Sequence, residues 1–192
     1  MQTEIVFAGF GGQGVLFAGQ LLTYTAMNEG MHVTWIPSYG PEMRGGTANC
    51  TVVVSDQSIG SPVVRNPGIA VVFNLPSLDK YESLVKPGGL LVVNSALIAR
   101  AVARRDVTAL LVPANAVADE LGSPRLLNMV MLGALLAKRP IVTLEAVEHT
   151  LDATLSGSKR ALLEMNVQAL HRGHAIGAGE AVPRLSRPAR AT

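Results

Sequence analysis

The sequence has one cysteine, Cys50, among 192 residues, and it is poor in charged and aromatic side chains. A single cysteine excludes a disulfide framework and any metal cage built from several thiolates. Charged residues make up 16% of the chain, against roughly 25% in an average soluble domain. Aromatic residues contribute 4%, so Val, Leu, Ile, Ala and Met must form most of the core. High apolar content with a small net charge excludes a disordered chain, and the length predicts one domain.

Long hydrophobic runs are also lacking. No apolar run reaches the roughly 18 residues that a membrane-spanning helix needs. The longest one, residues 126–137, contains Asn128 and stops at Lys138 and Arg139. Glu4 interrupts any signal-like segment at the start of the chain. We therefore expect no membrane segment and a location in the cytoplasm, where a lone cysteine stays reduced.

The net charge of +2 is confined to the end of the chain. Residues 1–172 hold 13 basic and 13 acidic side chains, and the surplus comes from three arginines after them: Arg184, Arg187 and Arg190 against Glu180. A neutral body does not indicate nucleic-acid binding. A charge-poor aliphatic surface instead suggests that partners cover much of the molecule.

Short aliphatic runs alternate with helical patterns along the chain. This alternation predicts an α/β fold with a Rossmann-like, doubly wound, mostly parallel sheet, helices on both faces and a helical C-terminal part. The runs 69–73, 90–93 and 108–112 have the pattern of strands buried on both faces, and 47–55 is expected to pair antiparallel. We expect one domain over residues 1–172 and a flexible or partner-bound tail over 173–192. The predicted elements are strands at 5–8, 32–36, 47–55, 69–73, 90–93 and 108–112, and helices at 15–29, 77–85, 114–121, 125–138, 143–155 and 159–172.

A glycine loop joins the first predicted strand to the first predicted helix. Its spacing, Gly9-x-Gly11-x-x-Gly14, is that of the dinucleotide-binding fingerprint in the strand–loop–helix context that the fingerprint requires. Glycines let the backbone turn sharply and let a phosphate approach, and the free N–H groups of the helix then face the anion. The alternative is a tight strand-to-helix turn that binds nothing.

The second half of a nicotinamide-dinucleotide site is missing. That site needs an acidic residue at the end of the second strand, about 20 residues on, to hold the ribose. Here the strand ends at Pro37 and Ser38, while Glu29 lies before the strand. No Gly-Lys-Ser/Thr follows the glycine loop, so it is not a P-loop either. The pattern favours another phosphate-bearing ligand.

A second glycine-rich loop follows the second strand. It combines Tyr39, Glu42 and Arg44 with three glycines and a proline. In a doubly wound sheet this loop reaches the same edge as the glycine loop, where a guanidinium can bind a phosphate with two hydrogen bonds. The alternative is an ordered surface loop closed by a Glu42–Arg44 ion pair.

Together, the blocks 9–15 and 37–50 resemble the gamma subunit of the 2-oxoacid:ferredoxin oxidoreductases, the group that acts on pyruvate, 2-oxoglutarate or ketoisovalerate. The stretches 59–62, 74–81 and 128–134 support the resemblance, which covers residues 3–172. The tail after residue 172 matches nothing we can assign.

The resemblance implies a subunit that is inactive alone and helps to bind coenzyme A in the oxidative decarboxylation of a 2-oxoacid to an acyl-CoA. It implies alpha and beta partner subunits that carry thiamine diphosphate, Mg²⁺ and 4Fe–4S clusters, a possible ferredoxin-like delta subunit, and ferredoxin as electron acceptor. It implies no catalytic or metal-binding residue in this chain. The coenzyme A contacts would come from Gly9, Gly11, Gly12, Gln13 and Gly14 in the first loop, and from Ser38, Tyr39, Gly40, Arg44, Gly45 and Gly46 in the second.

Two other functions stay open on the residues alone: a stand-alone NAD(P)-dependent Rossmann oxidoreductase, and a nucleotide-binding module without catalysis. Two features have more than one interpretation. The apolar segment 128–134 is either buried in its own core or packed on another subunit, and we favour the second. Asn74 follows a predicted strand, as either a site residue or a cap.

Overall fold

The computed structural model describes residues 1–38, 47–155 and 157–180. Its strands form one sheet in the order β2-β3-β1-β4-β5-β6. β1 pairs parallel with β4, β4 with β5 and β5 with β6, whereas β3 is antiparallel to both β1 and β2. The strands are β1 (Gln2–Phe10), β2 (His32–Ser38), β3 (Thr47–Ser55), β4 (Ile69–Val72), β5 (Leu90–Asn94) and β6 (Thr108–Val112).

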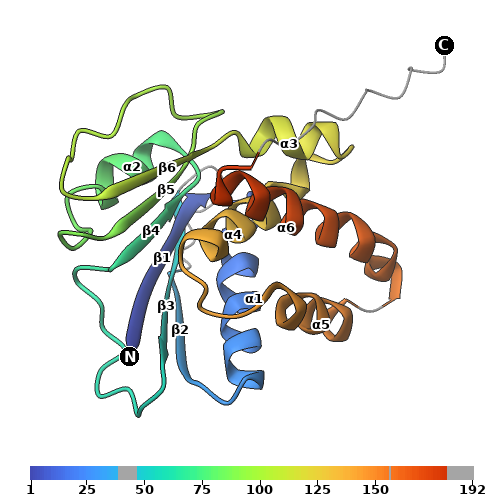
Figure 1. Cartoon of the computed structure of the whole chain (residues 1–192), viewed down its shortest axis with the longest axis horizontal. Coiled ribbons are helices and arrows are strands. Elements are labelled where there is room, and N and C mark those ends of the chain that lie inside the picture. Colours follow the sequence, from blue (N-terminus) through green and yellow to red (C-terminus); the bar gives the residue numbers. More distant parts are fainter. Residues whose placement is uncertain (39–46, 156, 181–192) are drawn as a thin grey trace.

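Helices cover both faces of this sheet. α2 lies on one face, and α1, α4, α5 and α6 lie on the other (Figure 1). Two short 3-10 turns, Pro124–Leu126 and Gly157–Leu162, precede α4 and α6. The helices are α1 (Val15–Asn28), α2 (Leu75–Tyr81), α3 (Ala114–Glu120), α4 (Leu127–Lys138), α5 (Leu144–Thr154) and α6 (Leu163–Ala178).

The predicted α/β fold with a helical C-terminal part is confirmed, and so is the antiparallel pairing of residues 47–55. The sheet is mixed, because β3 lies between β1 and β2 and runs antiparallel to both. One expectation for the strands is wrong: β6 is an edge strand, and only Val112 in it is buried. An apolar run cannot reveal whether a further strand will pair beside it.

The most buried helix is α4, in which every residue from Leu127 to Leu136 is buried. It packs against α6 so closely that their backbones meet. A Cβ on Gly133 would lie 1.9 Å from the carbonyl oxygen of Leu170, and one on Gly173 would lie 2.0 Å from that of Val130. Our interpretation that a face of this helix packs on another subunit is therefore wrong, because its own fold covers it.

The C-terminal helix continues past the predicted end of the domain. α6 reaches Ala178, and both Gly173 and Gly177 are buried against α4. The first six residues of the predicted tail thus belong to the folded body, while residues 181–192 lie outside the described residues. Among the described helices, none is both long and apolar enough to cross a membrane.

Candidate functional site

The candidate site lies at the edge of the sheet where β1, β2 and β4 end. Phe10 is paired with Thr47, the first residue of β3, and Ser38 is paired with Asn49. The backbone N–H of Phe73, just after β4, donates to the carbonyl oxygen of Ala8. Strand pairing therefore brings the glycine loop, the end of β2 and the start of β3 to one edge, as the sequence predicts.

Gly9 is the last glycine of β1 and sits in a crowded position. A Cβ there would lie 2.6 Å from Gln13 Oε1, 2.7 Å from Phe73 Cβ and 2.8 Å from Val15 Cγ2. Helix, strand and loop approach one another too closely at this point for any side chain. Gly9 thus serves close packing between β1 and α1, which is one of the roles that glycine has in the fingerprint.

The turn itself depends on backbone conformation. Gly12 has a φ of +94° and Gly14 a φ of +73°, values that L-residues rarely adopt. Among the described residues, nothing lies within 4 Å of a Cβ built on Gly12, so the described part of the chain leaves its backbone open. Gly11 and Gly12 are exposed, while Gln13 and Gly14 are half-buried. The exposed part of the turn is bare backbone, which a phosphate can approach.

Gln13 closes the loop on itself. Its side-chain Oε1 accepts a hydrogen bond from Phe10 N at 2.7 Å, and its backbone N–H donates to Phe10 O at 3.2 Å. The Gln13 side-chain oxygen and backbone N–H are thus both engaged in holding the turn.

The glycine loop leads directly into the N-terminus of α1. Gly14 is the N-cap residue, no side chain in the described part of the chain caps the helix, and its first turn contains no acidic residue. The first N–H groups of a helix lack partners within it and carry a partial positive charge. An uncapped 14-residue helix behind an open glycine turn therefore favours an anionic ligand such as a phosphate.

Asn128, at the start of α4, is a residue of this site that sequence reasoning missed. Its Nδ2 donates to the carbonyl oxygen of Gly14 at 3.2 Å. The two residues are 114 positions apart, so no local pattern joins them. The available signal was that Asn128 opens one of the stretches that carry the family resemblance.

The residues that flank the second loop lie at the same edge. Ser38, the last residue of β2, is exposed there. The other predicted contacts, Tyr39, Gly40, Arg44, Gly45 and Gly46, lie outside the described residues. Both flanks of this loop, Ser38 and Thr47, lie within two strands of the glycine loop, as the sequence predicts.

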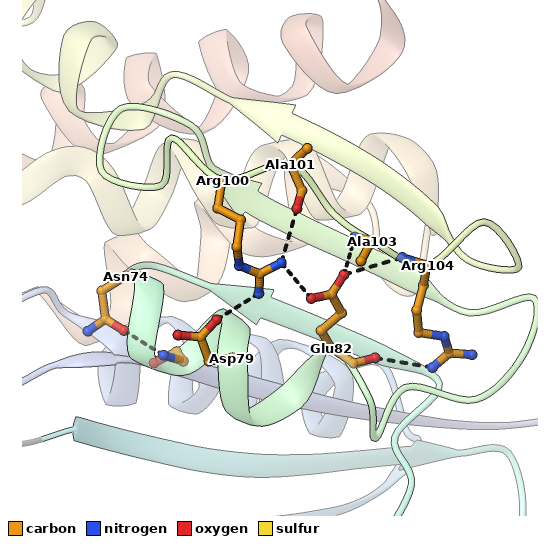
Figure 2. Close-up of polar contacts among 8 residues, drawn as sticks. Asn74, Asp79, Glu82, Arg100, Ala101, Ala103 and Arg104 are labelled. Carbon is orange, nitrogen blue, oxygen red and sulfur yellow. Dashed lines mark hydrogen bonds and ion pairs between the residues drawn. The ribbon is translucent and has the colours of Figure 1, made fainter.

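Asn74 proves to be a cap. Its Oδ1 accepts a hydrogen bond from Ser77 N at 2.9 Å at the start of α2, and only 2% of the residue is exposed. Figure 2 shows this cap beside an ion-pair network that ties the segment after β5 to α2. Arg100 bridges Asp79 at 2.7 Å and Glu82 at 2.8 Å.

The Glu82 carboxylate is held from several sides. Burial alone would raise its pKa, but hydrogen bonds from Arg100 and from the backbone N–H groups of Ala103 and Arg104 outweigh burial, so the pKa lies below its ordinary value. Arg104 in turn donates to the carbonyl oxygen of Glu82 at 3.1 Å. All these hydrogen-bond partners belong to the fold itself, so we assign the Glu82 network a structural role and not a catalytic one.

Cys50 is a buried core residue. Burial raises the pKa of its thiol to about 12, and a contact with Trp35 acts in the opposite direction. Its sulfur lies under α1, 2.4 Å from where a Cβ on Gly19 would be. A fully buried, un-ionised thiol is neither a nucleophile nor a cluster ligand. Within the described residues, no three His, Cys, Asp or Glu side chains gather as a metal site would require.

Comparison with known proteins gives a consistent set of similarities. The family described as pyruvate ferredoxin/flavodoxin oxidoreductase matches residues 4–176. Ketoisovalerate oxidoreductase subunit VorA of Methanothermobacter marburgensis is 40% identical over 174 residues, which are 90% of this chain and 36% of that protein. The chain thus spans about a third of the length of this curated relative.

Two solved structures share the fold. The gamma subunit of a keto/oxoacid ferredoxin oxidoreductase from Geobacter sulfurreducens has a TM-score of 0.79 and 28% identity, over 92% of this chain and 99% of that one. A 2-oxoglutarate:ferredoxin oxidoreductase from Magnetococcus marinus, with 2-oxoglutarate, coenzyme A and succinyl-CoA bound, has a TM-score of 0.84. It is 24% identical, and the match covers 97% of this chain and 33% of that one.

Proposed function

Because the chain belongs to the pyruvate ferredoxin/flavodoxin oxidoreductase family, we propose that it is the gamma subunit of a 2-oxoacid:ferredoxin oxidoreductase. In this proposal it acts inside a hetero-oligomer and helps to bind coenzyme A. The enzyme converts a 2-oxoacid, coenzyme A and two oxidised ferredoxins into an acyl-CoA, carbon dioxide, a proton and two reduced ferredoxins. The chain itself binds and orients coenzyme A and is inactive alone.

The observation that carries the proposal is the open turn at Gly12 in front of the uncapped helix α1. Coenzyme A carries a diphosphate and a ribose phosphate, which are the anions that such a helix N-terminus attracts. Gly9, Gly11, Gly12, Gln13 and Gly14 form this part of the proposed site. Ser38 and the second loop would reach the same ligand from the end of β2, since Ser38 and Thr47, which flank that loop, lie at the same edge of the sheet as Phe10.

The redox chemistry belongs to partner subunits in this proposal. An iron–sulfur cluster needs about four thiolates, whereas the chain has only the buried Cys50. The residues of this chain therefore do not fit such a cluster. We place thiamine diphosphate, Mg²⁺ and the 4Fe–4S clusters on alpha and beta subunits, with a ferredoxin-like delta subunit as a further partner and ferredoxin as acceptor.

The lengths of the relatives support an assembly. The Geobacter gamma subunit matches over nearly its whole length, while VorA and the Magnetococcus enzyme continue far beyond the matched part. The same domain thus occurs as a separate chain and as part of a longer one. A cytoplasmic complex is in keeping with the reduced, buried Cys50.

The test is Gly12→Val in the assembled enzyme. The branched side chain projects from the open turn, and the positive φ costs about 1–3 kcal/mol of local strain. We expect the KM for coenzyme A to rise about tenfold or more while the subunits still assemble, because Gly12 is exposed and touches no core residue.

Gly122→Val is the matched control. Gly122 has a φ of +89° and equally open surroundings, but it lies at the end of α3. It should show the same strain with an unchanged KM for coenzyme A. An equal change in both variants, or loss of assembly in Gly12→Val alone, would refute a coenzyme A role for the glycine loop.

A further inference from the structure

The contact between α4 and the glycine loop joins two parts of the chain that local sequence does not connect. Asn128 Nδ2 donates to Gly14 O at 3.2 Å, and the Asn128 residue is only 5% exposed. Its other amide atom, Oδ1, accepts a hydrogen bond from Met129 N at 2.9 Å. Turning the amide over would face donor to donor and acceptor to acceptor, so these two bonds fix its orientation.

Gly14 and Asn128 fit each other sterically as well. A Cβ on Gly14 would lie 2.4 Å from Asn128 Nδ2, so the asparagine occupies the space that any other residue at position 14 would need. Gly14 also has the positive φ of +73° and caps α1. Its carbonyl oxygen accepts the first helical bond from Ala18 N at 3.0 Å. The direction of that carbonyl therefore sets where the turn ends and where α1 begins.

Asn128 belongs to α4, a helix that is held rigidly in the fold. The α4 residues that follow it are buried to Leu136, and the helix is clamped to α6 at Gly133 and Gly173. An amide carried on this helix cannot follow the movements of an exposed turn. It can instead hold one end of the turn in place while Gln13 closes the other end on Phe10.

We propose that Asn128 is a positioning residue for coenzyme A, which acts by holding the Gly14 carbonyl and thereby the N–H groups of the glycine turn and of α1. This inference rests on the proposed function of the loop. Asn128 does not touch the ligand itself. Without the Asn128 side chain, the glycine loop is still present but adopts several conformations. Coenzyme A must then order the loop when it binds, and this cost lowers the affinity for coenzyme A.

Asn128→Leu is the principal test, since leucine has a similar size and lacks both amide atoms. Asn128→Ser is the second variant. Its hydroxyl can still accept from a nearby backbone N–H but is too short to reach Gly14, so it keeps the start of α4 satisfied if the leucine variant does not fold. Both are made in the assembled complex with its partner subunits.

Thr150→Val is the matched control, because it removes a buried hydrogen bond from the other end of α1. Thr150 is 3% exposed, and its hydroxyl accepts from Asn28 Nδ2 at 3.4 Å and donates to Ala146 O at 2.9 Å. It should lower the Tm as the Asn128 variants do, without reaching the glycine loop.

Two measurements decide the inference. In the Asn128 variants the KM for coenzyme A should rise about three- to tenfold, the effect of one hydrogen bond, with kcat at saturating coenzyme A changed less than about twofold. Amide hydrogen exchange of residues 11–17, measured without coenzyme A, should become faster. Thr150→Val should change neither quantity.

An unchanged KM, an equal rise in the control, or unchanged exchange of the loop would overturn the positioning role. A wild-type complex that turns over without coenzyme A would instead refute the proposed function. The exchange measurement contains no coenzyme A, so it still decides whether Asn128 holds the loop.

Discussion

Gly9, Gly12 and Gly14 are glycines for three different reasons. Gly9 allows β1 and α1 to touch, Gly12 adopts a positive φ in open space, and Gly14 combines a positive φ with the close approach of Asn128. The motif predicted the strand, the turn and the helix correctly. The motif could not distinguish these three roles. Each role depends on which residues of other elements pack against the glycine, and the spacing of the glycines along the sequence does not show this.

Arg44 is the residue of the second loop whose chemistry the sequence specifies most clearly. If its guanidinium binds a phosphate of coenzyme A, Arg44→Ala should weaken binding by about 1.5–3 kcal/mol, the usual effect of a charged hydrogen bond. Calorimetric titration of the complex with coenzyme A measures this directly. An unchanged Kd would remove Arg44 from the site.

Glu82 gives a prediction on pH. Its folded pKa is lowered, so its stabilising effect is complete above the unfolded value of about 4.3 and is lost as the pH falls through the folded pKa. Glu82→Gln should therefore cost about 1–3 kcal/mol of unfolding free energy at pH 7. The difference from wild type should shrink below about pH 4.

Denaturant unfolding at pH 7 and at pH 3 to 4 measures that difference. Glu29→Gln, at an exposed position just after α1, serves as control and should stay within about 0.5 kcal/mol of wild type. A cost for Glu82→Gln that is equal at both pH values would contradict the assigned role of the charge in the network of Figure 2.

At the scale of elements, the packing of α4 against α6 is where sequence reasoning went wrong. A helix that is apolar all round is buried, but the pattern does not say by what. Gly133, Gly173 and Gly177 allow α6 to approach until the two backbones meet, and this covers the face that we had assigned to a partner. The glycines were visible in the sequence, but their alignment across two helices was not.

Gly173→Ala tests this packing. By helix propensity alone, the change would stabilise α6 by about 1 kcal/mol. Because the new Cβ would lie 2.0 Å from the carbonyl oxygen of Val130, we expect net destabilisation of about 1–3 kcal/mol or more. Thermal unfolding measures the sign, and a rise in Tm would contradict the packing.

Gly60→Ala is the control for that experiment. Of the residues that the structure describes, none lies within 4 Å of a Cβ built at Gly60, and the φ of Gly60 is not positive. It should be neutral or stabilise by up to about 1 kcal/mol through the unfolded state.

For the molecule as a whole, the sequence predicted the class of fold and that the glycine loop and the end of β2 meet at one edge of the sheet. The strand order and the edge position of β6 could not be predicted from the sequence, because an apolar run does not show which strands will pair beside it. The Asn128–Gly14 contact was out of reach for the same reason. The sparse charge and the single buried cysteine are in keeping with the proposed function, in which the redox chemistry lies on partner subunits.

The central claim is that this chain serves coenzyme A binding in a 2-oxoacid oxidoreductase complex. It is tested most directly by the purified complex, offered a 2-oxoacid, with reduction of ferredoxin followed in the presence and absence of coenzyme A. We predict reduction that requires both the 2-oxoacid and coenzyme A, and no activity of the isolated chain. Hydride transfer to NAD by the isolated chain, or turnover of the complex that is indifferent to coenzyme A, would contradict the account.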